Sequence, residues 1–426
     1  MLRKPISRRR AIKGATAAAA TALVPEAITG FPAVLSQEDK VLRYLGTAVN
    51  QSADIAKKVK EDTGITISYI PVTTDDVTRR VITQPNSYDV VDTEYFSLKK
   101  LVPSGNMLAM DGNRIKNFDK ITPVFTRGAL PSGKVIGDQG TAPKKVMFLE
   151  GENSTKFASQ ITRWATLIPT VYNADTLGIR PDLIKRPINT WKELLNPEFK
   201  GRASILNIPS IGIMDAAMVV ESMGDYKYPD KGNMTRAEID RTMKVLTEAK
   251  QAGQFRAFWK DFNESVNLMA SGETVIQSMW SPAVTAVKSK GIPCTYQPLV
   301  EGYRAWAAGF ALSKGGKGSK KADLAYEFVN WVLGGWAGAY LNRQGSYSAV
   351  LETAKANMEP YEWAFWMEGK PAEKDIKAPD GTLLEKAGAT RDGGSYEERM
   401  GAVACWNAVM DENDYMVRKW NEFIAA

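Results

Sequence analysis

The sequence predicts an α/β fold of two lobes, joined by crossing strands and separated by a cleft. The chain has 426 residues, which is more than one typical domain holds. Patterns of strand, helix and strand follow one another in the order that builds parallel sheets. Two mostly apolar segments, residues 164–173 and 304–312, have the pattern of strands that pass between lobes. Two such crossings make a hinge.

The first lobe is expected to begin with a parallel βαβ unit. Residues 41–45 have the pattern of a strand, and the helix that follows carries Ile55 and Val59 on one face and ends at Gly64. Residues 65–70 alternate apolar and polar side chains, as a half-buried strand does. The three elements span about 30 residues, which is typical of a βαβ unit.

The next buried strand, residues 88–92, ends in a group of acidic and aromatic residues. Asp92, Glu94, Tyr95 and Phe96 lie at its carboxyl end, and this is the edge where open α/β sheets bind ligands. Asp92 and Glu94 are therefore candidates for pairing with an ammonium group. Carboxylates at such a position also face the dipole of a following helix, and that interpretation stays open.

Helix and strand signals alternate through the predicted second lobe. Two capping boxes of the S/T-x-x-E form predict helix starts: Thr190 with Glu193, and Thr235 with Glu238. A strand over residues 273–280 leads to a short helix that Pro282 opens. This strand and the second crossing segment present Trp280 and Trp306, whose amphipathic rings can hold a small ligand between the lobes. Burial in a hydrophobic core is the alternative for both.

The rest of the chain is expected to return to the first lobe. Residues 320–341 have helical spacing with an interruption at Gly334 and Gly335, residues 370–394 form a polar surface loop, and a final helix runs from about residue 396 to 423. The expected parts are a signal peptide (1–33), lobe 1 (40–165), lobe 2 (166–304), and the return to lobe 1 with a C-terminal helical extension (305–426).

The N-terminus has the features of a twin-arginine export signal. Arg8, Arg9 and Arg10 come before a mildly apolar, alanine-rich segment and a zone of small residues near residue 33. A basic arm for nucleic acid is the alternative, but alanines follow instead of further basic or aromatic residues. Without residues 1–33 the net charge falls from +7 to +2, so no nucleic-acid partner is predicted. We expect the exported, mature protein to be soluble, since no other stretch holds 18 uninterrupted apolar residues.

Several chemistries are excluded by composition. The chain has no histidine, which removes His-based acid–base catalysis, Ser-His-Asp and Cys-His nucleophiles and most zinc sites. No metal or other cofactor is predicted. Cys294 and Cys405 are the only cysteines; they can pair in an oxidising compartment, or they can be two separate buried thiols.

Several segments resemble extracellular solute-binding proteins of the spermidine/putrescine type, which feed ABC importers. The resemblance covers about residues 40–350, and its most specific part is T-W-K-E-L at 190–194 followed by N-P-E-F-K-G at 196–201. Further matching segments are Tyr88-Asp89-Val90-Val91, Trp164-Ala165-Thr166, Met279-Trp280-Ser281 and residues 322–333. The resemblance implies a periplasmic binding protein fold, a periplasmic location, a binding role without catalysis, and a permease and an ATPase in the inner membrane as partners. We expect a monomer.

The resemblance also implies site residues. Trp280 and Trp306 match tryptophans that stack on the ligand, and Glu94 and Phe96 match the loop that lines the first lobe. The chain departs from the polyamine binders at Ala308, where they have an acidic residue, and at 208–210, where Ile-Pro-Ser replaces acids. A buried ammonium without a carboxylate is costly, so these departures count against a polyamine.

Three further side chains are candidates with open alternatives. Trp164 lies at the first crossing, and Tyr347 follows a Gly-Ser pair and is placed at the rim of the cleft. Arg304, like Arg163, flanks a crossing, where it can bind an anion or form an ion pair between lobes.

Three functions follow from these residues. The leading hypothesis is a receptor for a small cationic or amine-containing solute. The second is a receptor for an anionic or zwitterionic solute bound by Arg163 or Arg304. The third, from another class, is an exported carbohydrate-active enzyme that uses Asp92 and Glu94 as its acid and base.

Overall fold

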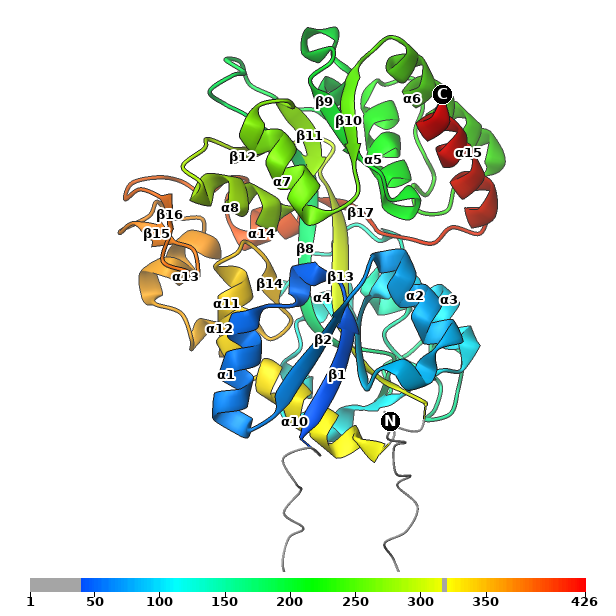
Figure 1. The fold of residues 1–426 in the computed structure, drawn as a ribbon, viewed down its shortest axis with the longest axis vertical. Coiled ribbons are helices and arrows are strands. Elements are labelled where there is room, and N and C mark those ends of the chain that lie inside the picture. The colour runs from blue at the N-terminus through cyan, green and yellow to red at the C-terminus, as the bar shows by residue number, and fades with distance from the viewer. Residues whose placement is uncertain (1–39, 316–319) are drawn as a thin grey trace, which may run out of the picture. The chain divides into compact units, whose positions relative to one another are not determined.

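A single mixed β-sheet runs through both lobes, with the strand order β10-β9-β11-β8-β13-β3-β1-β2 (Figure 1). The computed structural model describes residues 40–315 and 320–426. The predicted export signal, residues 1–33, lies outside the described residues. Within them, no helix has both the length and the apolar character that a bilayer crossing requires.

The first lobe begins with the predicted parallel βαβ unit, and this prediction is confirmed. The side-chain oxygen of Ser52 caps the first helix, and Gly64 ends it in the left-handed conformation, at φ 76°. The strands of this lobe are β1 Val41–Gly46, β2 Thr66–Pro71 and β3 Val90–Glu94, with β1 parallel to both others. Its main helices are α1 Ala53–Thr63, α2 Thr74–Thr83, α3 Leu98–Leu101, α10 Ala322–Val332 and α11 Trp336–Asn342.

The second lobe is built around three parallel strands. These are β9 Ala203–Leu206, β10 Phe255–Trp259 and β11 Ile276–Met279. Its helices are α5 Pro209–Ser222, α6 Arg236–Gln251, α7 Phe262–Ser271 and α8 Ser281–Ser289. The predicted short helix after residue 280 is confirmed, with Pro282 in its first turn, where the missing N–H costs nothing.

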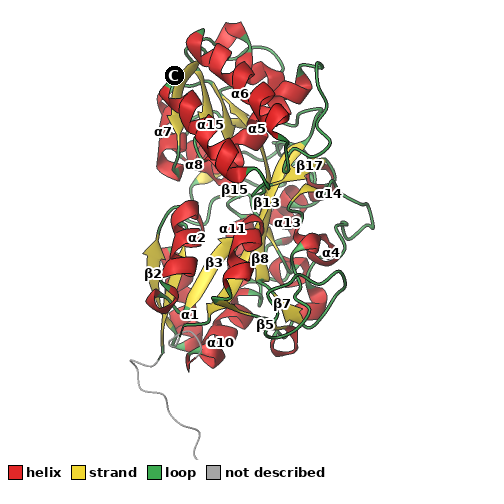
Figure 2. Ribbon diagram, turned by 90° about the vertical axis from the view of Figure 1, so that its right-hand side faces the viewer, coloured by secondary structure: helices red, strands yellow, loops and turns green. Residues whose placement is uncertain are grey.

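Two long strands connect the lobes at the centre of the sheet (Figure 2). β8 Ile168–Ile179 and β13 Tyr303–Ser313 are antiparallel to each other. β8 continues into the second lobe through β11, and β13 continues into the first lobe through β3. Almost every residue of both strands is buried, which fits the continuous apolar runs that predicted them.

A third strand also runs along the crossing. β17 Val403–Trp406 is parallel to β13, and α15 Asn413–Ala425 then packs on α5 and α6 (Figure 1). The chain therefore ends in the second lobe and not in an extension of the first, and the single final helix predicted for 396–423 is wrong. Its first part, α14 Tyr396–Met400, is only five residues long, because the next residues pair with β13 instead.

The segment predicted as a surface loop, residues 370–394, contains a small hairpin and one fully buried cation. The hairpin strands are β15 Ile376–Lys377 and β16 Leu383–Glu385. Arg391 is only 6% exposed. Other elements of this region are β12 Thr295–Tyr296, β14 Tyr347–Ser348, α12 Leu351–Lys355 and α13 Pro360–Trp366.

The two predicted capping boxes have different outcomes. Thr235 and Glu238 form the reciprocal box at the start of α6, as predicted. The hydroxyl of Thr190 instead donates to the Oε1 of Glu301 at 2.5 Å, and only a 3₁₀ helix follows. Glu193 is bound by Arg186 at 2.6 Å, so neither member of that pair caps a helix.

The two cysteines are separate thiols. Cys294 and Cys405 are both free and buried, and they belong to different hydrophobic clusters. Burial raises the pKa of each thiol to about 12, which makes both unreactive at neutral pH.

The packing of α15 leads to a stability prediction. Trp420 is fully buried, and its indole N–H donates to Asn207 Oδ1 at 2.8 Å. Replacing it by alanine removes a large core side chain, so we expect Trp420→Ala to lower the free energy of unfolding by about 3–5 kcal/mol. Urea unfolding measures the change. The exposed neighbour Asn421 is the control, and Asn421→Ala should shift the value by less than about 0.5 kcal/mol. Equal effects would mean that α15 does not pack on the second lobe.

Candidate functional site

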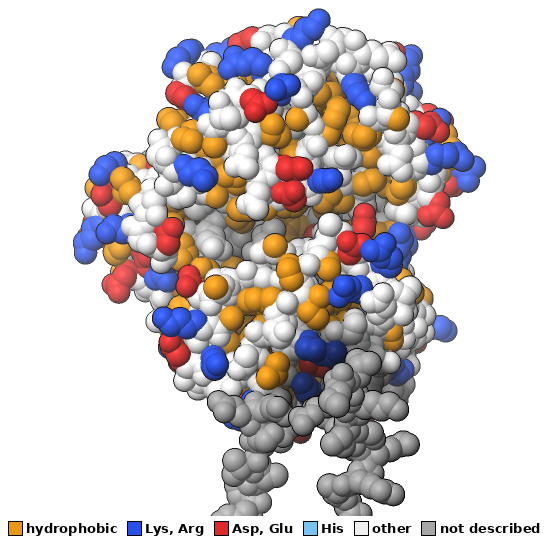
Figure 3. Space-filling view, in the orientation of Figure 1, with side chains coloured by type: hydrophobic (Ala, Val, Ile, Leu, Met, Phe, Trp, Pro, Cys, Tyr) orange, Lys and Arg blue, Asp and Glu red, His pale blue; other side chains and the backbone are white. Residues whose placement is uncertain are grey.

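A cavity lies where the two lobes meet, and the molecular surface is hollowed there (Figure 3). It is open to solvent, and the empty space among its lining atoms, open solvent included, is about 510 Å³. Its walls come from both lobes and from the segment after β17, and its only charged side chain is that of Glu94. The lining residues are Thr47, Asn50, Thr74, Glu94, Ile211, Trp280, Pro282, Trp306 and Asn407.

The two tryptophans predicted from the sequence face this cavity from different lobes. Trp280 is the residue before α8, and its ring meets that of Trp259 edge-on, with centroids 4.8 Å apart. Trp306 lies on β13 and packs on a small cluster that includes Val171 and Leu341. Each ring is half-buried, so packing fixes one part of it and the rest borders the cavity.

Glu94 supplies the carboxylate of the cavity from the end of β3. It lies opposite Ala308 in the antiparallel pairing of β3 with β13, and opposed residues share one face of a sheet. Trp306 is two residues before Ala308 on the same strand, so its side chain lies on that face as well. The sheet register therefore places a carboxylate and an indole side by side.

The environment of Glu94 favours its neutral form in the absence of a ligand. Desolvation raises the pKa of its carboxyl to about 7. The amide of Asn407, which donates to Glu94 Oε2 at 2.9 Å, and the positive charge of Arg304 act in the opposite direction. A cation in the cavity would add to these two effects and favour the ionised form.

Behind the cavity, Arg304 is held by buried acidic and amide groups. Its Nε is 2.6 Å from Asp215 Oδ1, its Nη2 is 3.4 Å from Asp175 Oδ2, and its Nη1 donates to Asn407 Oδ1 at 2.7 Å. The side chains of Arg304, Asp215 and Asp175 are almost completely buried. Arg304 does not line the cavity. It fixes the amide of Asn407, so that the other end of this amide donates to Glu94.

The other candidates near β3 lie below the cavity surface. Asp92 is buried and accepts hydrogen bonds from Tyr44 and Asn50, both at 2.8 Å; burial raises its pKa to about 6. Tyr95 is buried in the first lobe, where its hydroxyl donates to a backbone carbonyl. Phe96 belongs to the apolar cluster that also supports Trp280. These residues shape the site without lining it.

The remaining candidates are placed away from the cavity. Trp164 lies on β7 Trp164–Ala165, and the guanidinium group of Arg163 stacks on its ring at 4.2 Å from the centroid. Arg163 also binds Asp111 at 2.9 Å. Tyr347 is fully buried against the rings of Tyr172 and Tyr396.

Sequence reasoning missed the neutral polar part of the site. Asn407, Asn50, Thr47 and Thr74 line the cavity, but each stands in a segment without a motif. Their only local signal is position: Thr47 and Asn50 directly follow β1, at the same sheet edge that made Glu94 a candidate. Among the described residues no cluster of three or more acidic, cysteine or histidine side chains could hold a metal ion.

Comparison with known proteins settles the family. The model of the bacterial extracellular solute-binding protein family matches residues 54–359, which is more than half of the chain. The chain belongs to the bacterial extracellular solute-binding proteins. Membership agrees with the prediction of a binding protein and not an enzyme. A search of curated proteins finds no sequence that matches this one.

Solved structures similar to this solute-binding protein share its fold at low sequence identity. The spermidine/putrescine ABC transporter substrate-binding protein PotD of Streptococcus pneumoniae has a TM-score of 0.59 and 14% identity, over 90% of this chain and 97% of that one. The binding protein AgtB of A. tumefaciens R10, in complex with agropinic acid, has a TM-score of 0.59 and 15% identity, over 91% and 99%. A GABA receptor, Atu4243, has a TM-score of 0.56 and 18% identity, over 90% and 97%. The predicted periplasmic binding protein fold is confirmed.

The raised pKa of Glu94 predicts how its substitution changes the stability of the ligand-free protein. The folded-state pKa lies above the value of about 4.5 for an ordinary glutamate, so the folded state holds the proton more tightly. This group therefore lowers the stability progressively from about pH 4.5 to 7. Glu94→Gln should remove this decline. Relative to the wild type, the free energy of unfolding of the variant should be higher by about 1–3 kcal/mol more at pH 8 than at pH 5. Thermal unfolding across this range measures the difference, and identical pH profiles would refute it.

Proposed function

We propose that this protein is the substrate-binding component of an ABC importer and captures a small amine with one positive charge. The observation that carries the proposal is the position of Glu94 beside two half-buried tryptophans in one cavity. An ammonium group can pair with the carboxylate while its alkyl groups contact the indole faces.

The charges around the cavity favour one ammonium over two or three. Glu94 is the only acidic residue of the lining, and no basic residue is part of it. A diamine or triamine would bring further charges into the cleft without carboxylates to pair them, and an unpaired buried charge is costly. The polyamine interpretation is therefore replaced by a monoamine, a quaternary ammonium compound included.

The two alternatives receive less support from the same residues. An anionic solute would need a free cation, but Arg304 is engaged by Asp215 and Asp175, and Arg163, the residue before β7, is paired with Asp111. A zwitterion remains compatible with the cavity if the polar side chains Thr47, Asn50 and Thr74 hold its carboxylate. For a carbohydrate-active enzyme, Asp92 would have to reach the cavity, but it is buried below it, with its Oδ2 bound by Tyr44 and Asn50.

The transport role follows from the two-lobe architecture. A solute held between Trp280 and Trp306 contacts both lobes at once, so it binds the closed arrangement more tightly than the open one. A permease and an ATPase of the inner membrane are the expected partners, and the periplasm the expected location, in keeping with the predicted export signal. We propose that the protein acts as a monomer.

Substitution of the lining residues tests the ligand class. Thermal-shift screening of monoamines, quaternary ammonium compounds, diamines, amino acids and organic anions first identifies a ligand, and calorimetry then gives its affinity. Trp280→Ala and Trp306→Ala should each weaken binding about 2- to 30-fold, since a cation–π contact contributes about 0.5–2 kcal/mol. Trp164→Ala, which removes a tryptophan outside the cavity, should leave the affinity unchanged. A ligand without a cationic group that binds better than any amine would overturn the proposal.

The protonation state of Glu94 makes the affinity depend on pH. An ammonium pairs with the ionised carboxylate, and in the free protein the pKa of this carboxyl is about 7. Affinity should therefore rise roughly tenfold between pH 6 and pH 8 and level off above that, with release of a proton on binding at pH 6. Calorimetry in two buffers of different ionisation enthalpy measures both effects. Glu94→Gln should bind about 10- to 150-fold more weakly at pH 8, because a charge-assisted hydrogen bond is lost, and show no pH dependence. A steep pH dependence in this variant would place the responsible carboxylate elsewhere.

A further inference from the structure

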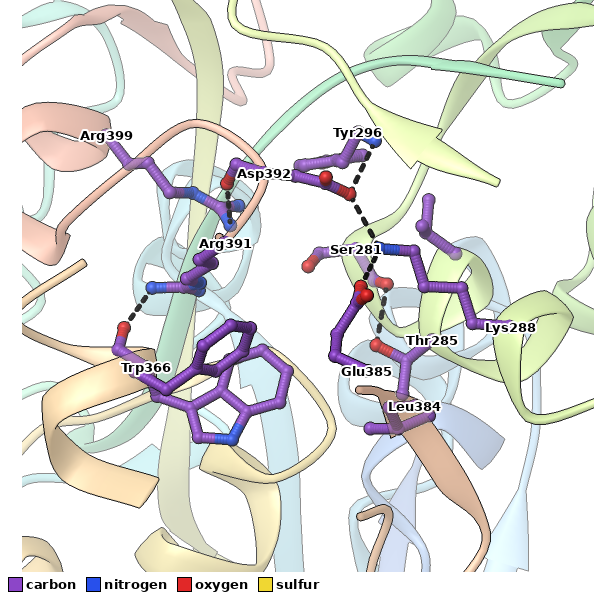
Figure 4. A pocket seen from close by; sticks show the side chains of 12 residues that line it. Ser281, Thr285, Lys288, Tyr296, Trp366, Leu384, Glu385, Arg391, Asp392 and Arg399 are labelled. Carbon is purple, nitrogen blue, oxygen red and sulfur yellow. Dashed lines mark hydrogen bonds and ion pairs between the residues drawn. The ribbon is translucent and has the colours of Figure 1, made fainter. Parts of the chain in front are cut away.

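A second cavity lies between α8, the β15–β16 hairpin and the segment around Arg391 (Figure 4). It shares no lining residue with the cleft of Glu94 and the two tryptophans. Five of its side chains are charged: three cations and two carboxylates. The lining residues are Ser281, Val284, Thr285, Lys288, Tyr296, Phe365, Trp366, Leu384, Glu385, Arg391, Asp392 and Arg399.

Both carboxylates of this cavity are already paired with a lysine. Lys288 forms ion pairs with Glu385 and, at 2.9 Å, with Asp392. Asp392 also accepts a hydrogen bond from the backbone N–H of Tyr296 at 3.0 Å. In Figure 4 Lys288 and Glu385 lie across the cavity from the two guanidinium groups, and Asp392 lies next to Arg399. Lys288 thus neutralises part of the charge of both acids, and the two arginines of the cavity are not paired with either carboxylate.

The two arginines are buried without an acidic partner in the part of the chain that the structure describes. Arg391 is 6% exposed and Arg399 3%. Arg391 donates from Nη1 to the backbone carbonyl of Trp366, and Arg399 from Nη1 to that of Asp392 at 3.5 Å. Neither has a carboxylate oxygen within 4.0 Å among the described residues. Aromatic rings of Tyr347 and Trp366 lie about 5 Å from the Arg391 guanidinium.

Three guanidinium nitrogens of this pair have no hydrogen-bond partner. They are Nε of Arg391 and Nε and Nη2 of Arg399, and the indole nitrogen of Trp366 is unpaired as well. Burial and the charge of Arg399 lower the pKa of Arg391 to about 10. Leaving a buried charged donor without a partner costs more than leaving a neutral donor without one. These three nitrogens can therefore donate to a further acceptor placed in the cavity.

We propose that this cavity binds a small oxyanion through Arg391 and Arg399. The net charge of the lining, with Lys288, Arg391 and Arg399 against Glu385 and Asp392, is +1, so one anionic charge completes it. Guanidinium groups bind the paired oxygens of carboxylates and phosphates through two parallel hydrogen bonds. A free inorganic anion and the carboxylate of a small metabolite share this chemistry.

The position of the cavity indicates what the anion does. Arg391 and Arg399 belong to the C-terminal segment, whereas Ser281 and Thr285 lie on the first turns of α8, directly after Trp280. An anion held by the arginines joins this segment to α8 and stabilises their packing. The inference does not rest on the proposed amine ligand, because no lining residue is shared.

Thermal unfolding with inorganic phosphate or acetate tests the site. At constant ionic strength, balanced with a bulky sulfonate too large for the cavity, either anion should raise the Tm in a saturable way. A response to phosphate alone identifies a phosphate-type oxyanion, and one to acetate alone a carboxylate. The absence of a saturable response to both would overturn the proposal.

Substitutions test whether the anion that raises the Tm binds in this cavity. Arg399→Met should weaken anion binding at least tenfold, while Arg418→Met, an arginine that is 64% exposed on α15, should not change it. Because Arg399→Met can also impair folding, Glu385→Gln gives an independent test. It removes a repelling charge from a side chain at the edge of the cavity, 22% exposed, and should strengthen binding several-fold. Its matched control is Glu273→Gln, which removes an exposed carboxylate elsewhere.

The outcomes separate this site from the cleft. Glu94→Gln should leave the phosphate or acetate response unchanged, and Glu385→Gln should leave amine binding unchanged. If the anion response survives Arg399→Met and does not change in Glu385→Gln, the anion binds elsewhere and the proposal is wrong.

Discussion

The buried charge of Arg304 is the constraint on which the site depends. A guanidinium group removed from water must be balanced by carboxylates and by hydrogen bonds to its other nitrogens. Its partners come from β8 (Asp175), from α5 (Asp215) and from the segment after β17 (Asn407). Only an arrangement that brings these parts to the crossing strand β13 satisfies it. The same contacts hold the amide of Asn407 against Glu94. The charge and hydrogen bonding of the cavity therefore depend on the contacts that Arg304 makes at the crossing strands.

The parts of this arrangement that the sequence predicts are those with a local signal. β8 and β13 are continuous apolar runs, and the first βαβ unit has a capped helix between two strands, so their types follow from periodicity and end residues. Trp280 and Trp306 are candidates because two predicted strands present them to the gap between the lobes, and Glu94 because it lies at the carboxyl end of the predicted strand 88–92. Asn407 has no such signal. It is hydrogen-bonded to Glu94, which is 313 positions away in the chain. The residues next to either of them in the sequence give no sign of this contact.

Competition for hydrogen-bond partners explains where local patterns fail. Thr190 and Thr235 stand in identical T-x-x-E patterns, yet only Thr235 caps a helix. The hydroxyl of Thr190 donates to Glu301, 111 positions away, and the glutamate of its pattern, Glu193, pairs with Arg186. The prediction of one long helix in the C-terminal region is also wrong because of a distant partner. Residues 403–406 are compatible with a helix or a strand, and the open edge of β13 decides in favour of the strand. Long-range partners therefore set the third strand at the crossing and the lobe in which α15 ends.

The pairing of Ala308 with Glu94 changes how the missing acid should be interpreted. The polyamine binders that this chain resembles have an acidic residue where it has Ala308, and the absence of that acid counts against a polyamine. In the folded sheet, however, Glu94 lies directly opposite Ala308, and opposed residues of antiparallel strands project from the same face. A carboxylate is thus retained on that face, contributed by the neighbouring strand. What the ligand meets is the total charge of the face and not the identity of one position, and here that total is a single carboxylate. This charge and the two indole rings are the observations behind the proposed ligand with a single ammonium group.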